Sequence, residues 1–166
     1  MKKKLIALIS FLCYIICWVQ AADEHYYFKN LSIQDGLSQT TVNAIIQDKK
    51  GFMWFGTKGG LNRYDGMLFR NFKHDMTDNH SLGNNFVTCL YQDNNGNIWV
   101  GTDAGVYIYY SDQEIFIPFD RLSRENTKIE RTVSAISGDK QGRVWIAVET
   151  QGLFCYEPQK DRLYNY

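Results

Sequence analysis

The sequence is poor in proline and has no excess of charge of either sign. It contains 2 prolines in 166 residues, and its 18 Lys+Arg are balanced by 18 Asp+Glu. With 45% hydrophobic residues, such a composition argues against disorder. A net charge of zero removes the electrostatic case for binding nucleic acid or an acidic membrane surface. The length allows one ordinary domain and excludes a large multidomain enzyme.

The sequence also lacks the common catalytic and nucleotide-binding motifs. It contains no P-loop, Rossmann glycine pattern, G-x-S-x-G or H-E-x-x-H. Its histidines, His25, His74 and His80, do not have metal-ligand spacing, and we interpret them as solvated. We therefore expect no catalytic residue, metal or cofactor in this chain, and we do not expect an enzyme.

One long hydrophobic run stands at the N-terminus. Residues Leu5–Val19 are apolar and follow Lys2–Lys4, and small residues come next, a pattern typical of a secretory signal peptide. We expect residues 1–21 to be removed by cleavage after Ala21. The run is short for a membrane span, which needs ~20 apolar residues, although an uncleaved anchor is an alternative. Loss of three lysines leaves 15 basic and 18 acidic residues, so we expect an exported, periplasmic chain with no membrane span.

The rest of the chain is a threefold repeat. Copies aligned on Trp54, Trp99 and Trp145 are spaced by 45 and 46 residues. Each has Asp six residues and Gly three residues before the Trp, and a later Gly followed after four residues by Tyr. The repeat positions are Asp48, Gly51, Trp54, Gly56, Gly60 and Tyr64; Asp93, Gly96, Trp99, Gly101, Gly105 and Tyr109; and Asp139, Gly142, Trp145, Gly152 and Tyr156. Such self-similarity indicates a repeat architecture.

Each copy predicts four short strands. The first ends at an Asp-x-x-Gly tight turn, and the second, around the Trp, has apolar residues on both sides and should be buried on both faces. Gly56 and Gly101, two residues after the Trp, leave space for close packing. The expected first strands are Val42–Gln47, Val87–Gln92 and Val133–Ser137; the third are Leu61–Tyr64, Val106–Tyr109 and Leu153–Tyr156; the fourth are Leu68–Phe72, Ile115–Phe119 and Leu163–Tyr166.

Four antiparallel strands in about 45 residues fit the blade of a β-propeller. We therefore predict an all-β fold with blades at residues 42–72, 87–119 and 133–166. Residues 26–41 would supply a closing strand, Tyr26–Leu31, and a lead-in. Propellers usually have about 4–8 blades, so three blades and one strand make an incomplete propeller.

The repeats resemble a known family. The stretches GLSQTTVNAIIQDKKGFMWFGTKGGLNRYDG, SLGNNFVTCLYQDNNGNIWVGTDAGVYIY and VSAISGDKQGRVWIAVETQGLFCY are similar to the two-component regulator propeller repeat of hybrid two-component systems, mainly from Bacteroides-type bacteria. The third departs, with Ala147 and Val148 in place of Gly-Thr. The resemblance implies the start of a periplasmic sensor of carbohydrate breakdown products. The kinase, receiver and DNA-binding parts of such systems are not in this sequence.

No ligand-binding residue can be named from the repeats. We interpret each Trp as core, because its neighbours are apolar and all copies carry it. Asp93, Asn95 and Asn97 alternate as in a calcium loop, but the other copies place Lys and Gln there, so we predict a turn. Cys89 and Cys155 lie in different copies, which makes a disulfide improbable.

Two alternatives stay open. A free-standing binding or scaffold propeller could complete itself by self-association, and would be a defined dimer or larger ring. A propeller-fold polysaccharide lyase or glycosidase would need a carboxylate pair, or a His or Tyr with a metal, at one channel end. A carbohydrate ligand rests on the resemblance alone, and further blades in the same chain or in another copy are the other expected partners.

Overall fold

The computed structural model describes residues 27–122 and 128–166, which contain twelve strands in three sheets. The first sheet holds β1 (Val42–Gln47), β2 (Met53–Thr57), β3 (Gly60–Tyr64) and β4 (Phe69–Phe72); the second holds β5 (Val87–Gln92), β6 (Ile98–Thr102), β7 (Gly105–Tyr110) and β8 (Ile115–Pro118); the third holds β9 (Val133–Gly138), β10 (Val144–Val148), β11 (Gly152–Glu157) and β12 (Arg162–Asn165). Two short 3-10 turns, η1 (Ile33–Asp35) and η2 (Phe119–Arg121), lie outside the sheets.

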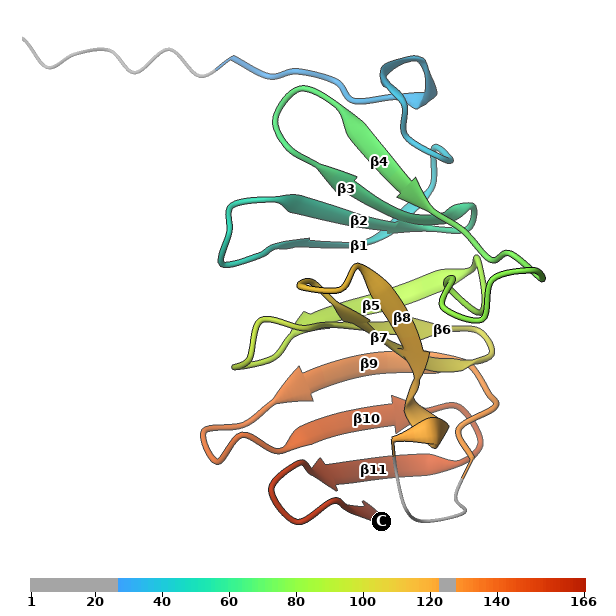
Figure 1. Cartoon of the computed structure of the whole chain (residues 1–166), viewed down its shortest axis with the longest axis vertical. Helices are drawn as coiled ribbons and strands as arrows, with labels where there is room; N and C mark the ends of the chain where they lie inside the picture. The colour runs from blue at the N-terminus through green and yellow to red at the C-terminus, as the bar shows by residue number, and fades with distance from the viewer. Residues whose placement is uncertain (1–26, 123–127) are drawn as a thin grey trace, which may run out of the picture. The chain divides into compact units, whose positions relative to one another are not determined.

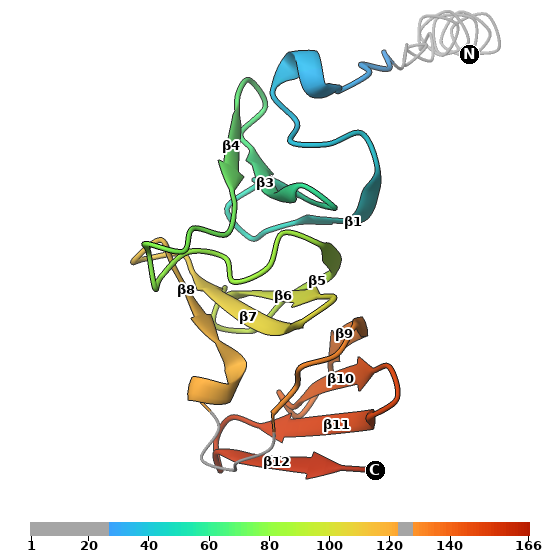
Figure 2. The ribbon, with the colours of Figure 1, turned by 90° about the vertical axis from the view of Figure 1, so that its right-hand side faces the viewer.

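Every sheet is a four-stranded antiparallel meander in chain order. The three sheets are stacked face to face (Figures 1 and 2), and the first strands β1, β5 and β9 approach one another from sheet to sheet. Short hairpin connections produce this topology, since antiparallel neighbours need only tight turns. The prediction of an all-β fold built from four-stranded, propeller-like blades is confirmed.

The hydrophobic core lies between the sheets. One cluster joins Trp54 and Leu61 of the first sheet to Ile98 and Tyr109 of the second. A second cluster joins the second sheet to the third, with Trp99, Ile108, Val133, Ile146 and Phe154 among its members. Each outer sheet therefore buries one face against the middle sheet, and the middle sheet buries both of its faces, which is the packing expected of blades.

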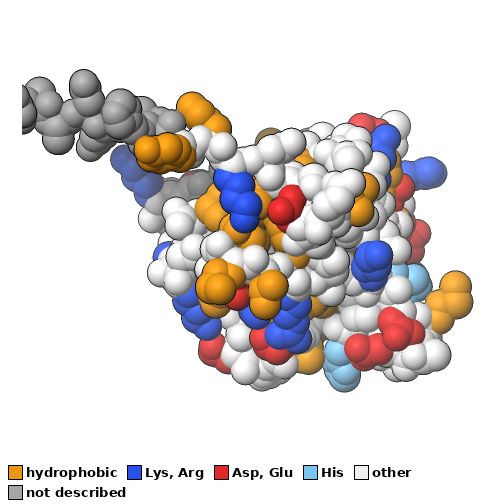
Figure 3. All heavy atoms as spheres, turned by 90° about the horizontal axis from the view of Figure 1, so that it is seen from above, with side chains coloured by type: hydrophobic (Ala, Val, Ile, Leu, Met, Phe, Trp, Pro, Cys, Tyr) orange, Lys and Arg blue, Asp and Glu red, His pale blue; other side chains and the backbone are white. Residues whose placement is uncertain are grey.

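Burial on both faces occurs in the middle sheet and not in the outer two. All five residues of β6 are buried, whereas burial along β2 and β10 alternates. The expectation of a doubly buried Trp strand thus holds only where a sheet has a neighbour on each side. On the outward face of the first sheet, which residues 36–38 cover in part, Phe55 and Phe69 pack together and Ile45 is 56% exposed. Seen from above, this end of the molecule shows hydrophobic patches between charged side chains (Figure 3).

Gly56 and Gly101 lie where consecutive sheets come closest. A Cβ atom on Gly56 would be 2.5 Å from Cγ1 of Val87, and one on Gly101 would be 2.9 Å from Cγ1 of Val133. Valine of the next first strand thus occupies the space that a side chain would need. The predicted close packing at these glycines is present in the structure.

The lead-in to the first sheet differs from expectation. Residues 27–41 contain η1 and no strand, so the described part of Tyr26–Leu31 does not form the expected strand. A closing strand needs the edge of a partner sheet, and the three described sheets take all their strands from residues 42–165. Its closing role stays a prediction. Residues 31–41 are instead fixed on the first sheet, where the backbone N–H of Ser38 donates to Asn62 Oδ1 at 2.8 Å.

The expected leader, with its cleavage after Ala21, lies outside the described residues. Within residues 27–122 and 128–166, no helix has the length and apolar character needed to cross a membrane.

The packing at Gly56 can be tested by Gly56→Ala. We expect the free energy of unfolding to fall by about 1–3 kcal/mol, because the added methyl group overlaps Val87 and overpacking a core costs this much. Urea unfolding would show a lower midpoint with an unchanged slope.

Ala147→Gly is the matched control, since Ala147 takes the same place in the third sheet, where no described strand covers it. Its effect should stay below about 1 kcal/mol. An unchanged midpoint for Gly56→Ala would contradict the close approach of the two sheets.

Candidate functional site

Each first hairpin is closed by an aspartate that also holds the tryptophan. In the first sheet, Asp48 Oδ1 accepts hydrogen bonds from the backbone N–H groups of Lys50 and Phe52, both at 2.9 Å, and Oδ2 accepts one from Trp54 Nε1 at 2.8 Å. Gly51, the last residue of the turn, has φ 90°, which favours glycine. We call this arrangement the Asp–Trp clasp.

The clasp recurs in the other two sheets. Asp93 accepts from Trp99 Nε1 and Asp139 from Trp145 Nε1, both at 3.0 Å. Asp139 also accepts a hydrogen bond from Arg143 Nε at 2.6 Å. The hydrogen bonds from Trp145 and then Arg143 stabilise the ionised carboxylate and lower the pKa of Asp139 to about 2. These aspartates are therefore committed to structure.

The tryptophans also contact the next sheet. The rings of Trp54 and Tyr109 are 5.1 Å apart, and those of Trp99 and Tyr156 are 6.0 Å apart. The predicted repeat positions Trp and Tyr thus meet across the sheet interface, and both tryptophans are buried. Trp145 is only half-buried and packs against Tyr166. Tyr64, the first tyrosine of the series, packs on Phe69 instead.

Each first strand has a polar residue at a β-bulge, and in the first two sheets this residue reaches towards the next sheet. Asn43, Thr88 and Ser134 stand at the β-bulges of β1, β5 and β9. Asn43 Nδ2 donates to the carbonyl of Val87 at 2.7 Å, and Thr88 Oγ1 donates to the carbonyl of Val133 at 2.5 Å. Ser134 donates to Ala147 of its own sheet. The bulge re-aims a side chain, and here it sets the register between neighbouring sheets.

The clasp turns of neighbouring sheets border two grooves. The first groove, of about 210 Å³, lies between the clasp turns of the first and second sheets, and Lys49 and Gln92 are among its lining residues. The Lys49 side chain crosses this groove, and its Nζ donates to the Asn94 carbonyl at 2.9 Å. The second groove, of about 300 Å³, lies between the second and third sheets. Its lining includes Asn95, Asn97, Ile108, Tyr110, Tyr156 and Asp161.

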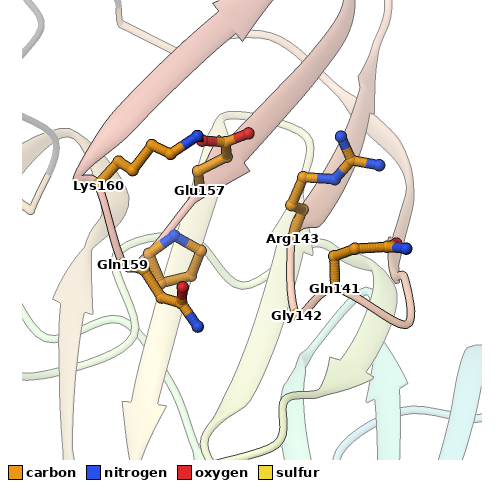
Figure 4. A pocket seen from close by; sticks show the side chains of 7 residues that line it. Gln141, Gly142, Arg143, Glu157, Gln159 and Lys160 are labelled. Atoms are coloured by element: carbon orange, nitrogen blue, oxygen red, sulfur yellow. The ribbon is translucent and has the colours of Figure 1, made fainter.

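A third hollow, of about 400 Å³, lies on the third sheet between its β9–β10 turn and its β11–β12 turn. Gln141 and Arg143 face it from the β9–β10 turn, and Glu157 and Lys160 from the opposite side (Figure 4). Lys160 Nζ is 2.8 Å from Glu157 Oε2. It is an open depression lined by polar and charged side chains.

The other positions considered from sequence that the structure describes are two thiols, a turn aspartate and two histidines. Cys89 and Cys155 are free thiols, and Asp93 accepts the backbone N–H groups of Asn95 and Asn97 as a turn residue. No group of three or more potential ligands among residues 27–122 and 128–166 could hold a metal. His74 lies near the Leu82 carbonyl and His80 near Asp78, and His25 lies outside the described residues.

Sequence reasoning identified the clasp residues but not the bond between them. The constant six-residue spacing from Asp to Trp was the available signal, since a turn alone requires only the Asp and the Gly. The bulge residues and the second groove were not found. Both depend on how one sheet lies against the next.

Two segments of the chain, residues 36–59 and 81–104, match the family model described as the two-component regulator propeller. These segments include the first two clasps. These two segments match two-component regulator propeller repeats. The third sheet has the same strand order and the same clasp, although its segment is outside the matched ranges.

Two known proteins of two-component systems are similar to parts of this chain. The chain is 38% identical over 77 residues to histidine kinase P4 of Formosa agariphila, which is 46% of this chain and 5% of that protein. A solved extracellular domain, assigned to the hybrid two component system BT3049 of B. thetaiotaomicron, superposes with a TM-score of 0.74 at 27% identity, covering 83% of this chain and 20% of that domain. The chain therefore corresponds to a small part of each protein.

The clasp can be tested by Asp48→Ala. The variant leaves the buried Trp54 N–H without an acceptor, and an unsatisfied buried donor costs about 1–3 kcal/mol. We expect the free energy of unfolding to fall by at least that amount, which urea unfolding would show as a lower midpoint.

The same change at an exposed aspartate, Asp112→Ala, is the control and should have little effect. Combining Asp48→Ala with Trp54→Phe should cost less than the sum of the two single changes, because the pair is removed together. Strict additivity would show that the hydrogen bond contributes nothing.

Proposed function

We propose that this chain is part of an extracytoplasmic ligand-sensing propeller of a two-component signalling protein, responding to carbohydrate breakdown products. The observation that carries the proposal is the superposition on a solved extracellular domain of a hybrid two component system over 83% of the chain. The carbohydrate class comes from the resemblance of the repeats. The matched repeats and the likeness to a histidine kinase support it. A leader over residues 1–21, cleaved after Ala21, would place the segment in the periplasm.

The signal output would come from other parts of such a protein. The chain spans 5% of its kinase relative, and the repeated aspartates Asp48, Asp93 and Asp139 serve in turns and clasps. We therefore assign it recognition and not catalysis.

Further blades are the second element of the proposal. The outward face of the third sheet carries Trp145, Leu153 and Tyr166, of which Leu153 is 38% and Tyr166 is 72% exposed. The corresponding faces of the first two sheets are covered by the next sheet. Because stacked repeats depend on such covering, we propose that another blade packs here, from the same protein or from a second copy.

Self-association of the chain tests whether the outward face of the third sheet is a contact surface. We expect sedimentation velocity to show association that grows with concentration, driven by burial of the apolar outward face. Leu153→Lys should shift the chain towards the monomer.

Met76→Lys is the control, since Met76 is 91% exposed in the loop between the first two sheets. Association that survives Leu153→Lys unchanged would show that this face is not the contact.

The sensing role predicts stabilisation by a sugar. We would measure the melting temperature of the full chain with a panel of soluble neutral and uronic-acid oligosaccharides. A ligand at 100-fold excess over Kd stabilises the folded state by about 2.7 kcal/mol, so at least one member should raise the melting temperature by several degrees.

The corresponding polyols, such as sorbitol at equal concentration, control for general solute effects. A panel without any specific shift would refute the carbohydrate ligand while leaving the fold assignment intact.

A further inference from the structure

The outward face of the first sheet repeats a surface that is buried elsewhere in the molecule. Val42 and Ile45 of β1 correspond in the repeat to Val87 and Leu90 of β5. Val87 and Leu90 are at most 8% exposed and belong to the core between the first and second sheets. Val42 is only partly buried and Ile45 is exposed. The strand β1 therefore carries the side chains of a sheet-to-sheet contact, although no described strand covers them.

The lead-in on this face is compatible with such a contact. Leu37 of the lead-in corresponds to Leu82, which precedes the second sheet, and both side chains are buried. Leu82 belongs to the core cluster between the first and second sheets, so a segment of this kind is part of a sheet-to-sheet contact. Residues 36–38 are bonded to β3 and β4 through Asn62 and Asn71, while Ile45 of β1 stays exposed.

A polar side chain at the end of β1 is held as its buried counterpart is held. Gln47 Nε2 donates to a carbonyl of its own clasp turn at 3.2 Å, and Gln92 Nε2 does the same in the second sheet at 3.1 Å. In the first interface, Gln92 Oε1 accepts the backbone N–H of Lys49 at 2.9 Å. Lys140 stands in the clasp turn of the third sheet where Lys49 stands in that of the first. Gln47 of one copy and Lys140 of another therefore match as acceptor and donor.

The outward face of the third sheet offers most of the receiving surface. Its Trp145 and Leu153 correspond to Trp54 and Leu61, the first-sheet residues that pack against the second sheet.

Ala147 makes the fit of this face imperfect. It takes the place of Gly56 and Gly101, and a Cβ atom on Gly56 would lie 2.5 Å from Cγ1 of Val87. Val42 of an incoming β1 would meet the Ala147 methyl group in the same way, and overpacking of a contact is unfavourable. We therefore expect a contact between copies to be weaker than the sheet contacts within one chain.

We propose that the outward face of the first sheet of one copy covers the outward face of the third sheet of another, so that copies of this chain join head to tail. This contact rests on the proposed covering of the third sheet and names the surface that supplies it. The two faces lie at opposite ends of the stack (Figure 1), so they cannot meet within one chain. Two copies carry six sheets, three in each, which is within the usual range of about 4–8 blades. A head-to-tail contact that closes forms a ring.

Two charge variants test the head-to-tail contact by complementation. Ile45→Lys alters the first-sheet face and Leu153→Lys the third-sheet face, and both residues are exposed, so each variant keeps its core. In sedimentation velocity of the full chain, each variant alone should associate at least about tenfold more weakly than the parent. An equimolar mixture should form a dimer, because each variant brings the face that the other lacks. Met76→Lys, in the loop between the first two sheets, is the control and should associate as the parent does.

A third variant should strengthen the contact. Ala147→Gly removes the methyl group that Val42 would meet, so we expect this variant to associate about tenfold more tightly than the parent. Adding Ile45→Lys to it should abolish the gain. This pair of variants decides the question even where association of the parent is too weak to measure.

Three results would overturn the proposal. Association of Ile45→Lys equal to that of the parent would remove the first sheet from the contact. A mixture of the two charge variants that stays monomeric while the parent associates would show that the third sheet meets a different surface, and the covering of that sheet would still stand. Association of Ala147→Gly no tighter than that of the parent would show that no valine meets this position. The sugar panel tests the sensing function separately, since it does not depend on these variants.

Discussion

The hydrogen bond from a tryptophan indole to an aspartate six residues earlier is the constraint on which the rest of the structure depends. It joins the turn of the first hairpin to the second strand of that hairpin. The Asp-x-x-Gly turn and the core tryptophan therefore form one unit. The carboxylate also satisfies two backbone N–H groups of the turn. A buried indole N–H needs such a partner, and the same bond orients the ring towards the tyrosine of the next sheet.

From this unit the stack is built by repetition. Glycine after the tryptophan admits the valine of the next first strand. The bulge residues Asn43 and Thr88 of the first two sheets donate to the carbonyls of these valines. The contacts that link one sheet to another therefore join mainly neighbouring sheets, as in other repeat architectures. The consequence is visible at the ends, where Ile45 of the first sheet and Trp145 of the third lie on faces that no described strand covers.

Where the copies agree, they specify the fold, and where they differ, the interfaces between the sheets are filled differently. Arg63 and Phe52 complete the first interface, whereas Ile108 and Asn97 leave the second one hollow. Function is commonly placed in this way, in variable positions on a rigid scaffold.

Much of the fold follows from the sequence alone. Constant offsets around three tryptophans, with turn residues between apolar runs, determine strand number, strand order and sheet composition, because these depend on local periodicity and turn chemistry. The clasp bond, the inter-sheet hydrogen bonds of Asn43 and Thr88 and the hollow at Asn97 were decided by the tertiary structure. Each depends on how one sheet lies against another, and no spacing within a single copy records that distance. The low proline content and the balanced charge indicated an ordinary folded chain. The packing of its sheets determined which interface between sheets is filled by side chains and which keeps a hollow.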